Sequence, residues 1–596
     1  MKPQAGTWRA DVLFGALGAT LVVLCVRLGV LTVKGGDFAR PRLQRQQIMV
    51  VPRPGRPGSI YAATLGSYVA LAVSRQEAVC FADPNLLARR LDDEKIANAC
   101  VAIGEALSLD AARIQTMLVA RRGDRFVPLK AGLSPREIQA VCDLGLGGVG
   151  IRHDWRREYP GGDLAATVIG FRHDCALAGM PPDRSGGGGL ELGLEQHLAG
   201  VDGCSVLLTD ARRRPLWEAG QRLPRDGDSV LLCLDAVVQE QLQAAVAGAV
   251  EQYSAKWGAG VVIEPRSGEV LAMCSAPSFD PGDFERADAA ARTNRAVCVP
   301  YEPGSAFKPI MTAAAVDAGA VSYETQLFCE NGEYHAARGG RLTDHGQHYG
   351  MLTVEDIVVH SSNIGMAKVG EKLGNAAQFE AVRRFGFDAR TGICLPGESP
   401  GIVRELRKWD GYSLRRVPFG QEISVTTLQL AMAFGVFANG GLLMEPQLVR
   451  EIRRPDGSPA WRLRPRVVRR VLKPCTAEQT LAVLQQAVER GTGKSCRLDR
   501  WTSWGKTGTA QIPGPGGYVP RAYVATFVGG APAVRPQVVC AISIYWPDAA
   551  KGYYGGKVAA PAVRQVLERT LVYLNVPPDR AARDRLPAVA RTPGGW

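Results

Sequence analysis

The sequence contains no C-x-x-C pair. Its 14 cysteines lie singly along the chain. Zinc ribbons and dithiol redox motifs need closely spaced cysteines, so the pattern argues against both kinds of site. Cys233 and Cys540 each stand inside an apolar run, which predicts that most of the cysteines are small buried apolar residues.

The composition has no extreme either. Hydrophobic residues make up 46% and charged residues 22% of the chain, close to globular averages. These values exclude a disordered protein and a polytopic membrane protein as descriptions of the whole chain. A chain of 596 residues is too long for one core, so we expect several domains that fold in water.

Basic residues are in excess but form no cluster. The 71 Lys and Arg against 58 Asp and Glu give a net charge of +13. Such an excess suits nucleic acid, an anionic membrane surface or an acidic polymer. Because the arginines are scattered, the sequence argues against DNA or RNA as a partner.

One hydrophobic run is long enough to cross a membrane. It extends from Val12 to Val33 and is interrupted only by Thr20, Arg27 and Thr32. A cleaved signal peptide is the alternative, but the run is too long and no A-x-A-like site follows it. More basic residues follow the run than precede it, and by this count the positive-inside rule would leave the large domain in the cytoplasm. The rule is a weak test for long domains, which can cross the membrane regardless of flanking charge. The flanking basic residues are Lys2 and Arg9 before the run and Lys34, Arg40, Arg42 and Arg45 after it.

Composition divides the rest of the chain. After a short tail (1–11) and the membrane helix (12–33), residues 34–225 mix short apolar runs with Gly, Pro and Arg, which predicts an extended, multi-part domain. A second domain is expected over 226–577. The Arg- and Pro-rich segment 578–596 is predicted to be a disordered tail.

Hydrophobic patterns outline the second domain. They predict a strand over 229–234 with a helix over 236–251, a hairpin from 258–264 and 268–274, and a strand pair from 522–527 and 537–545. The stretch from 305 to 490 is predicted to be mainly helical, with one helix over 425–439 ended by Gly440 and Gly441. The outline is an antiparallel sheet made by the two ends of a domain around a helical middle.

Ser305 and Lys308 form an S-x-x-K pattern. The two residues share one helix face if a helix starts near Ser305, as Pro309 suggests. A serine becomes nucleophilic when a base removes its proton, and a desolvated lysine near another cation is neutral enough to do so. Taken alone, the pattern fits an ordinary helix face better.

Two further elements follow in order: Ser361-Ser362-Asn363 and Lys506-Thr507-Gly508. S-x-x-K, an S-x-N element and K-T-G together are the signature of penicillin-binding proteins and serine β-lactamases. A turn at a strand end explains K-T-G alone but does not explain the set.

The chain resembles a class B penicillin-binding protein, a peptidoglycan D,D-transpeptidase of the FtsI division type, over nearly its whole length. The resemblance implies an α/β (α+β) transpeptidase fold, in which an antiparallel sheet with a helical subdomain follows an extended pedestal domain and one N-terminal transmembrane helix. Beyond the three motifs it includes Tyr301–Ser305, His360–Gly365, Val425–Ala431, Ala438–Gly441 and Tyr553–Gly556, with Arg157–Gly161 and Gly189–Leu192 in the pedestal.

The resemblance also implies residue roles. Ser305 would be acylated with Lys308 as its base, Ser361 would relay protons to the leaving amine, and Asn363 would hold the donor amide. Lys506, Thr507, Gly508 and Thr509 would meet the substrate carboxylate, and the N–H groups of Ser305 and Thr509 would form the oxyanion hole. No metal or cofactor is expected. His335, His345 and His348 are expected to be surface loop residues.

The chain departs from the family pattern twice. The pedestal usually opens with R-G-x-I-x-D-R, whereas Arg56–Ala63 lacks the Asp-Arg pair, which puts the pedestal's contacts in doubt. Cys233 stands where Thr is usual, a change expected to alter only packing.

The implied function is septal cross-linking at the bacterial inner membrane, with the catalytic domain in the periplasm. Expected partners are donor stem peptides ending in D-Ala-D-Ala, acceptor amines, β-lactams, a membrane glycosyltransferase of the shape, elongation, division and sporulation class, and other division proteins. The division type rests on Asn363, where elongation relatives generally carry Asp, and on the short tail without appended repeats. The alternatives are an elongation-type transpeptidase, a carboxypeptidase or β-lactamase-like hydrolase, and a non-catalytic β-lactam sensor or division scaffold.

Overall fold

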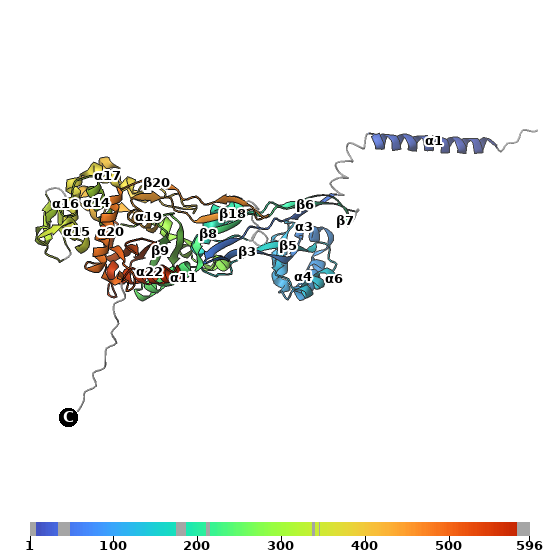
Figure 1. The fold of residues 1–596 in the computed structure, drawn as a ribbon. Coiled ribbons are helices and arrows are strands. Elements are labelled where there is room, and N and C mark those ends of the chain that lie inside the picture. The colour runs from blue at the N-terminus through green and yellow to red at the C-terminus, as the bar shows by residue number, and fades with distance from the viewer. Residues whose placement is uncertain are drawn as a thin grey trace, which may run out of the picture. The chain divides into compact units, whose positions relative to one another are not determined.

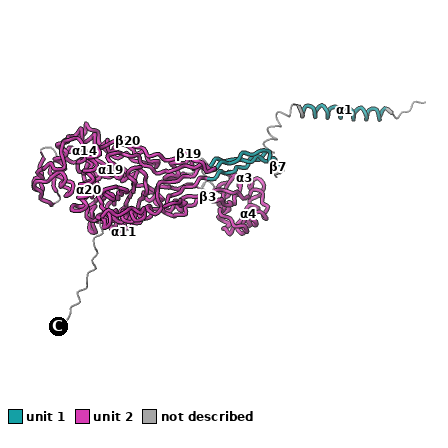
Figure 2. The backbone as a smooth tube through the Cα atoms, in the orientation of Figure 1, with its two compact units in different colours: residues 1–56, 200–226 teal, residues 57–199, 227–596 magenta. Residues whose placement is uncertain are grey.

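The computed structural model describes residues 7–33, 48–173, 186–209, 215–336, 340–344 and 346–580 (Figure 1). The chain divides into two compact units, residues 1–56 with 200–226 and residues 57–199 with 227–596 (Figure 2). Several residues weighed above lie outside the described ranges: Lys2, Lys34, Arg40, Arg42, Arg45, His345 and residues 581–596 of the expected tail.

The first unit holds the apolar helix and a small sheet. Helix α1 (Thr7–Val33) contains the apolar run, and its segment Trp8–Val30 is long and apolar enough to cross a membrane, with a mean hydropathy of 2.1. Strands β1 (Ile48–Arg53), β6 (Gly203–Thr209) and β7 (Pro215–Arg222) form an antiparallel sheet in the order β1-β6-β7.

The second unit begins with a sheet built from distant parts of the chain. Its order is β19-β18-β8-β2-β3-β4, and β5 also pairs with β3. The strands are β2 (Ile60–Thr64), β3 (Ser67–Ala82), β4 (Val127–Ala131), β5 (Val149–Glu158), β8 (Ser229–Asp235), β18 (Val449–Arg453) and β19 (Pro459–Arg462). Strands β18 and β19 therefore lie within the stretch expected to be mainly helical, because β8 offers an edge on which β18 pairs.

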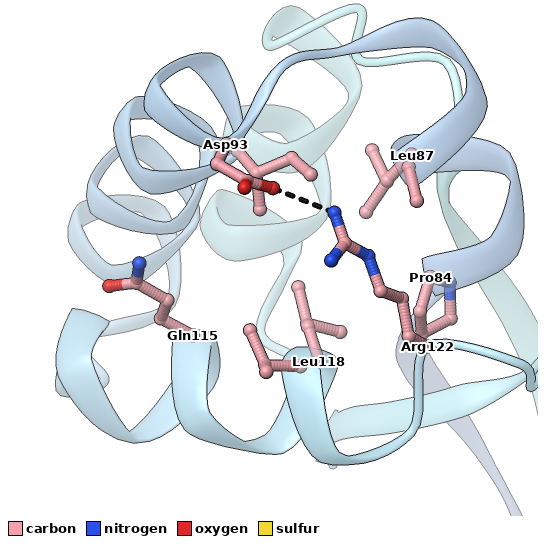
Figure 3. A pocket seen from close by; sticks show the side chains of 9 residues that line it. Pro84, Leu87, Asp93, Gln115, Leu118 and Arg122 are labelled. Atoms are coloured by element: carbon pink, nitrogen blue, oxygen red, sulfur yellow. Dashed lines mark hydrogen bonds and ion pairs between the residues drawn. The ribbon is translucent and has the colours of Figure 1, made fainter.

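Short helices pack beside β3 and β4. Three of the four, α3 (Pro84–Arg90), α4 (Asp93–Leu107) and α5 (Ala111–Ala120), begin at an Asp cap, and α6 (Pro135–Asp143) begins at the Ser134 capping box. Leu87 and Leu118 line a cavity of about 240 Å³ (Figure 3). Arg122 forms an ion pair of 2.7 Å with Asp93 beside this cavity.

A buried ion-pair cluster lies in the pedestal part of this unit. Arg157 Nε donates to Glu191 Oε1 at 2.6 Å, and Arg157 also donates to the carbonyl of Gly58. Arg172 contacts Glu191 at 3.5 Å and Glu195 at 3.0 Å. Two arginines therefore face two carboxylates, and we define these four residues as the pedestal cluster.

The second unit also contains the antiparallel sheet that the sequence predicts. Its order is β10-β9-β23-β22-β21. The strands are β9 (Trp257–Ile263), β10 (Val270–Ala276), β21 (Trp504–Gly514), β22 (Gly517–Ala531) and β23 (Val538–Tyr545). Both expected strand pairs form, β9 with β10 and β22 with β23.

Helices cover both faces of this sheet. Val262 packs in one core with α11 (Ala236–Gln252) and α22 (Ala560–Tyr573), whereas its neighbours Val261 and Ile263 pack in another core with α19 (Thr427–Ala438). This alternation is the period of two along a strand buried on both sides. Cys233 and Cys540 are buried, as expected.

A helical subdomain stands beside the sheet. It includes the 3₁₀ turn η2 (Gly304–Phe307), α14 (Lys308–Asp317), α15 (Val354–His360), α16 (Asn363–Leu373), α17 (Asn375–Arg384), α18 (Gly411–Arg416) and α20 (Pro474–Glu489). The short strands β12 (Glu333–Ala336) and β13 (Gly340–Thr343) form a hairpin in it. His335 lies on β12 rather than in a loop, and it is exposed.

Candidate active site

Ser305 lies in a tight turn against strand β21. The turn is 3₁₀, and the α-helix begins at Lys308, slightly later than expected. Gly304 has a φ of +53°, and a Cβ built there would lie 2.8 Å from the carbonyl oxygen of Thr509. Only glycine allows this backbone to approach β21 so closely, and the approach brings the serine turn next to Gly508 and Thr509.

Lys308 is fully buried at the start of α14. Its Nζ donates to Ser361 Oγ at 3.1 Å, to Asn363 Oδ1 at 2.8 Å and to the Ser361 carbonyl oxygen. The first two of the three motifs therefore meet at this ammonium group.

A sharp turn between α15 and α16 presents the second motif. Ser361 has a φ of +65° and ends α15, and Asn363 is the first residue of α16. The Ser362 hydroxyl caps α16 by accepting a hydrogen bond from the Gly365 N–H at 2.9 Å. Ser361 and Asn363 therefore face Lys308, while Ser362 serves the helix end.

Lys506 approaches the same serine from β21. Its Nζ donates to Ser361 Oγ at 3.0 Å and to Thr507 Oγ1 at 3.2 Å. Thr492 also contacts this group, at 3.4 Å from Lys506 Nζ and 2.9 Å from Thr507 Oγ1. Ser361 thus accepts hydrogen bonds from both lysines, so the two amines lie close together.

The surroundings disfavour positive charge on both amines. Burial, and then the charge of Lys506, lowers the pKa of Lys308 well below its usual value, and only Asp344 opposes this. Burial lowers the pKa of Lys506 to about 7. Within the described residues neither lysine donates to a carboxylate, so the site can supply a neutral amine near neutral pH.

The remaining part of the third motif lies along β21. A Cβ at Gly508 would lie 2.6 Å from the Pro303 carbonyl oxygen, so this position also requires close backbone approach. Thr509 Oγ1 accepts a hydrogen bond from the Gly555 N–H at 3.1 Å. The strand therefore places Lys506 to Thr509 along the turn that carries Ser305.

Asp344 was not found from the sequence. It is buried and follows β13. It accepts hydrogen bonds from Ser362 Oγ at 2.7 Å, Asn363 N at 2.5 Å and Ile364 N at 3.1 Å. No local pattern marks this residue, because its partners lie in another turn, but a single carboxylate fixes the turn of the second motif.

Comparison with known proteins identifies the family. The description "Penicillin binding protein transpeptidase domain" matches residues 258–568, and "Penicillin-binding Protein dimerisation domain" matches residues 53–232. The chain belongs to the class B penicillin-binding proteins. Peptidoglycan transpeptidation is the activity class of this family, with peptidoglycan as substrate and β-lactams as ligands.

Two relatives of this penicillin-binding protein match nearly end to end. A probable peptidoglycan D,D-transpeptidase, PbpC, of Pseudomonas aeruginosa is 32% identical and covers 95% of this chain and 94% of its own length. The peptidoglycan D,D-transpeptidase FtsI of Escherichia coli is 27% identical, and the match covers 96% of this chain and 93% of its own length.

Solved structures support the same fold. Penicillin-binding protein 3 of Mycobacterium tuberculosis, complexed with aztreonam, is 26% identical, covers 89% of this chain and 98% of its own, and gives a TM-score of 0.67. The transpeptidase domain of penicillin-binding protein 3 from Burkholderia pseudomallei is 30% identical. The match covers 59% of this chain and 98% of that domain, with a TM-score of 0.51. The expected fold class and family are confirmed.

Proposed function

We propose that this penicillin-binding protein is a serine-type D,D-transpeptidase acylated at Ser305. The observation that carries the proposal is the pair of buried lysines, Lys308 and Lys506, that share the Ser361 hydroxyl at 3.1 and 3.0 Å. Two ammonium groups so close, without a carboxylate between them, favour loss of one proton. A neutral Lys308 is the base that the serine requires.

The reaction runs in two acyl transfers. Ser305 Oγ attacks the carbonyl carbon of the penultimate D-Ala while its proton passes to Lys308 Nζ. The proton continues through Ser361 to the leaving amine, and the D-Ala–D-Ala bond breaks with release of D-Ala. The amine of a second stem peptide then attacks the ester carbonyl and loses its proton to the same base. The new amide forms as the ester C–O bond breaks, and the base returns the proton to Ser305 Oγ.

The other motif residues hold the donor peptide. Asn363 hydrogen-bonds the donor amide, and Lys506, Thr507, Gly508 and Thr509 face its carboxylate. The backbone N–H groups of Ser305 and Thr509 stabilise the oxyanion. Each such donor lowers the free energy of the transition state by about 3 kcal/mol in a site of this kind. The close approach of Gly304 to Thr509 supports this assignment.

Labelled penicillin tests the acylation. Mass spectrometry of the purified chain is expected to locate the label on Ser305, and Ser305→Ala is expected to lose it. Full labelling of Ser305→Ala, or label on another residue, would refute the proposal. Cross-linked product from lipid-linked precursor, formed with a glycosyltransferase partner, separates a transpeptidase from a hydrolase or a sensor.

The proposed cellular setting is the division septum. Helix α1 supports a single membrane span by its length and composition. We propose that this span lies in the inner membrane, with residues 1–11 in the cytoplasm and the pedestal (34–225) and transpeptidase domain (226–577) in the periplasm, where the peptidoglycan substrate lies. The proposed partners are a membrane glycosyltransferase of the shape, elongation, division and sporulation class and other division proteins. A reporter active only in the periplasm, fused after Trp596, is expected to be active.

Asn363 supports division rather than elongation. An amide in place of a carboxylate leaves the Lys308 contact at 2.8 Å without a charged partner. In a rod-shaped host, depletion is expected to give filaments that elongate without constricting. Rounded cells that still divide would assign the enzyme to elongation.

A further inference from the structure

The segment that leads into Ser305 is attached to the loop 420–425 at three successive points. Tyr301 and Val425 exchange both backbone hydrogen bonds, at 3.0 and 2.9 Å. The Gly304 N–H donates to the Gly420 carbonyl at 3.1 Å. Between these two contacts, the side chain of Glu302 accepts a hydrogen bond from the Glu422 N–H at 2.9 Å.

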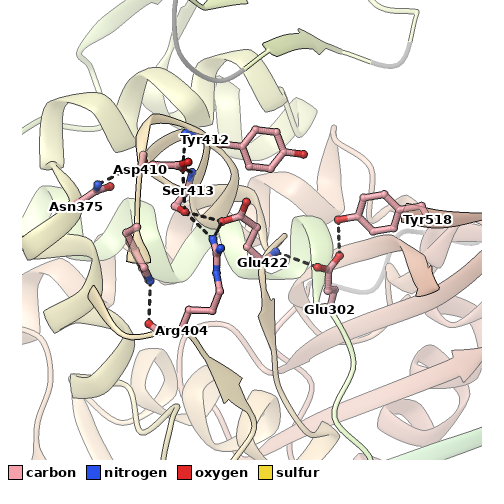
Figure 4. A network of polar contacts seen from close by, with 9 residues as sticks. Glu302, Asn375, Arg404, Asp410, Tyr412, Ser413, Glu422 and Tyr518 are labelled. Atoms are coloured by element: carbon pink, nitrogen blue, oxygen red, sulfur yellow. Dashed lines mark hydrogen bonds and ion pairs between the residues drawn. The ribbon is translucent and has the colours of Figure 1, made fainter. Parts of the chain in front are cut away.

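Glu302 also reaches β22, the strand paired with the one that carries Lys506. Strands β21 and β22 form a hairpin, and Tyr518 lies just after its turn, opposite Pro513. The Tyr518 hydroxyl donates to Glu302 Oε2 at 2.9 Å, so the two carboxylate oxygens have one donor each (Figure 4). Burial raises the pKa of Glu302, and both donated hydrogen bonds oppose that rise by stabilising the ionised form.

The loop beside Glu302 is held in an unfavourable conformation. Glu422 has a φ of +63°, which costs about 1 kcal/mol or more for a residue that is not glycine. The Glu422 side chain is fixed from the other side by the Ser413 hydroxyl at 2.7 Å and by Arg404. This conformation points the Glu422 N–H at Glu302, so the loop and the carboxylate hold each other.

We propose that Glu302 is a positioning residue for acylation, joining the loop 420–425, the Ser305 turn and the β21–β22 hairpin into one rigid site. It touches none of the reacting atoms. It sets the separation between Ser305 on its turn and Lys506 to Thr509 on β21, on which the nucleophile and the oxyanion hole both depend. The inference rests on the proposed acylation of Ser305.

Three variants test the inference. Glu302→Ala removes both acceptors, and we expect the limiting rate of acylation by labelled penicillin to fall about 30-fold while the affinity before acylation changes little. Tyr518→Phe breaks only the hairpin contact and is expected to cost about fivefold. Glu302→Gln is expected to stay within about threefold of wild type, because its oxygen accepts from Glu422 and its NH₂ donates to the Tyr518 oxygen.

Glu398 provides a matched control. It is as buried as Glu302, each being 8% exposed. It likewise accepts from backbone N–H groups and a hydroxyl, namely the N–H and hydroxyl of Thr391 and the N–H of Gly392 at 3.3 Å. Glu398→Ala is therefore expected to lose comparable thermal stability and less than about twofold in acylation. Hydrogen exchange of residues 513–519 is expected to quicken in Glu302→Ala and Tyr518→Phe but not in Glu398→Ala.

The outcomes are distinct. The positioning role would be overturned if Glu302→Ala were acylated as fast as Glu398→Ala, or if Glu302→Gln were acylated as slowly as Glu302→Ala. In either case, label on Ser305 of the wild-type chain would still uphold the proposed function. A wild-type chain that takes no label at Ser305 would overturn both.

Discussion

Two buried groups of cations in the second unit differ in how their charge is balanced. In the pedestal cluster, Arg157 and Arg172 face Glu191 and Glu195. In the candidate active site, the hydrogen bonds that Lys308 and Lys506 donate within the described residues all go to neutral oxygens: a serine, two threonines, an amide and backbone carbonyls. Balanced charge stabilises one protonation state and a fixed geometry, whereas unbalanced charge lowers the pKa of a lysine and makes it reactive.

The largest expected effect comes from Lys308→Ala. Removal of the proposed base should slow penicillin acylation by at least about 10³-fold, as measured by label incorporated over time. The melting temperature should stay level or rise, since a desolvated amine is removed. A variant that unfolds would contradict our view of this lysine as reactive rather than structural.

Glu191→Ala should have the opposite signature. It leaves Arg157 buried without its closest carboxylate, and breaking a buried pair in this way costs about 3–5 kcal/mol of unfolding free energy. Denaturant unfolding measures the loss. The acylation rate per folded molecule should be unchanged. A Glu191→Ala protein that kept its stability but was acylated slowly would show that the pedestal cluster and the lysine pair are coupled.

Asp344 affects both the charge and the geometry of the candidate active site. Asp344→Asn weakens the hold on Ser362, Asn363 and Ile364, and we expect acylation to slow by about tenfold. It also removes the negative charge that raises the pKa of Lys308, so the rising limb of the pH–rate profile should move to lower pH.

The control for Asp344 is Asp235, which also accepts two backbone N–H groups and one hydroxyl. Asp235→Asn should lower stability without shifting the profile. A shift in both variants, or in neither, would rule out the specific role of Asp344.

The smallest expected effect is a pH dependence. The pKa of Lys506 is lowered to about 7, so this lysine loses its charge as the pH rises through that value. The second-order rate constant for acylation by a penicillin that carries a free carboxylate should fall about fivefold between pH 7 and pH 8. A methyl ester of the same penicillin has no carboxylate to attract and should lack this fall; equal slopes would refute the role of Lys506.

Much of this organisation could be predicted from local patterns. The apolar runs at β9, β10, β22 and β23 predicted the sheet, and the order of the three motifs predicted the residues that surround Ser361. Asp344 and Glu302 could not be assigned contacts, because their partners lie on other segments and no spacing rule relates them. Strands β18 and β19 were missed because they are short, rich in Arg and Glu, and stable only beside β8.

The place of β8 between β2 and β18 bears on how the chain matures after synthesis. Strand β2 pairs with β8 in parallel and β8 pairs with β18, which begins at residue 449. An emerging chain therefore exposes the edge of β8 until most of its length has been made, and exposed strand edges favour aggregation. The strand that covers this edge, β18, lies between the second and the third motif, so β8 acquires its second neighbour only after both Ser305 and Ser361 have been synthesised.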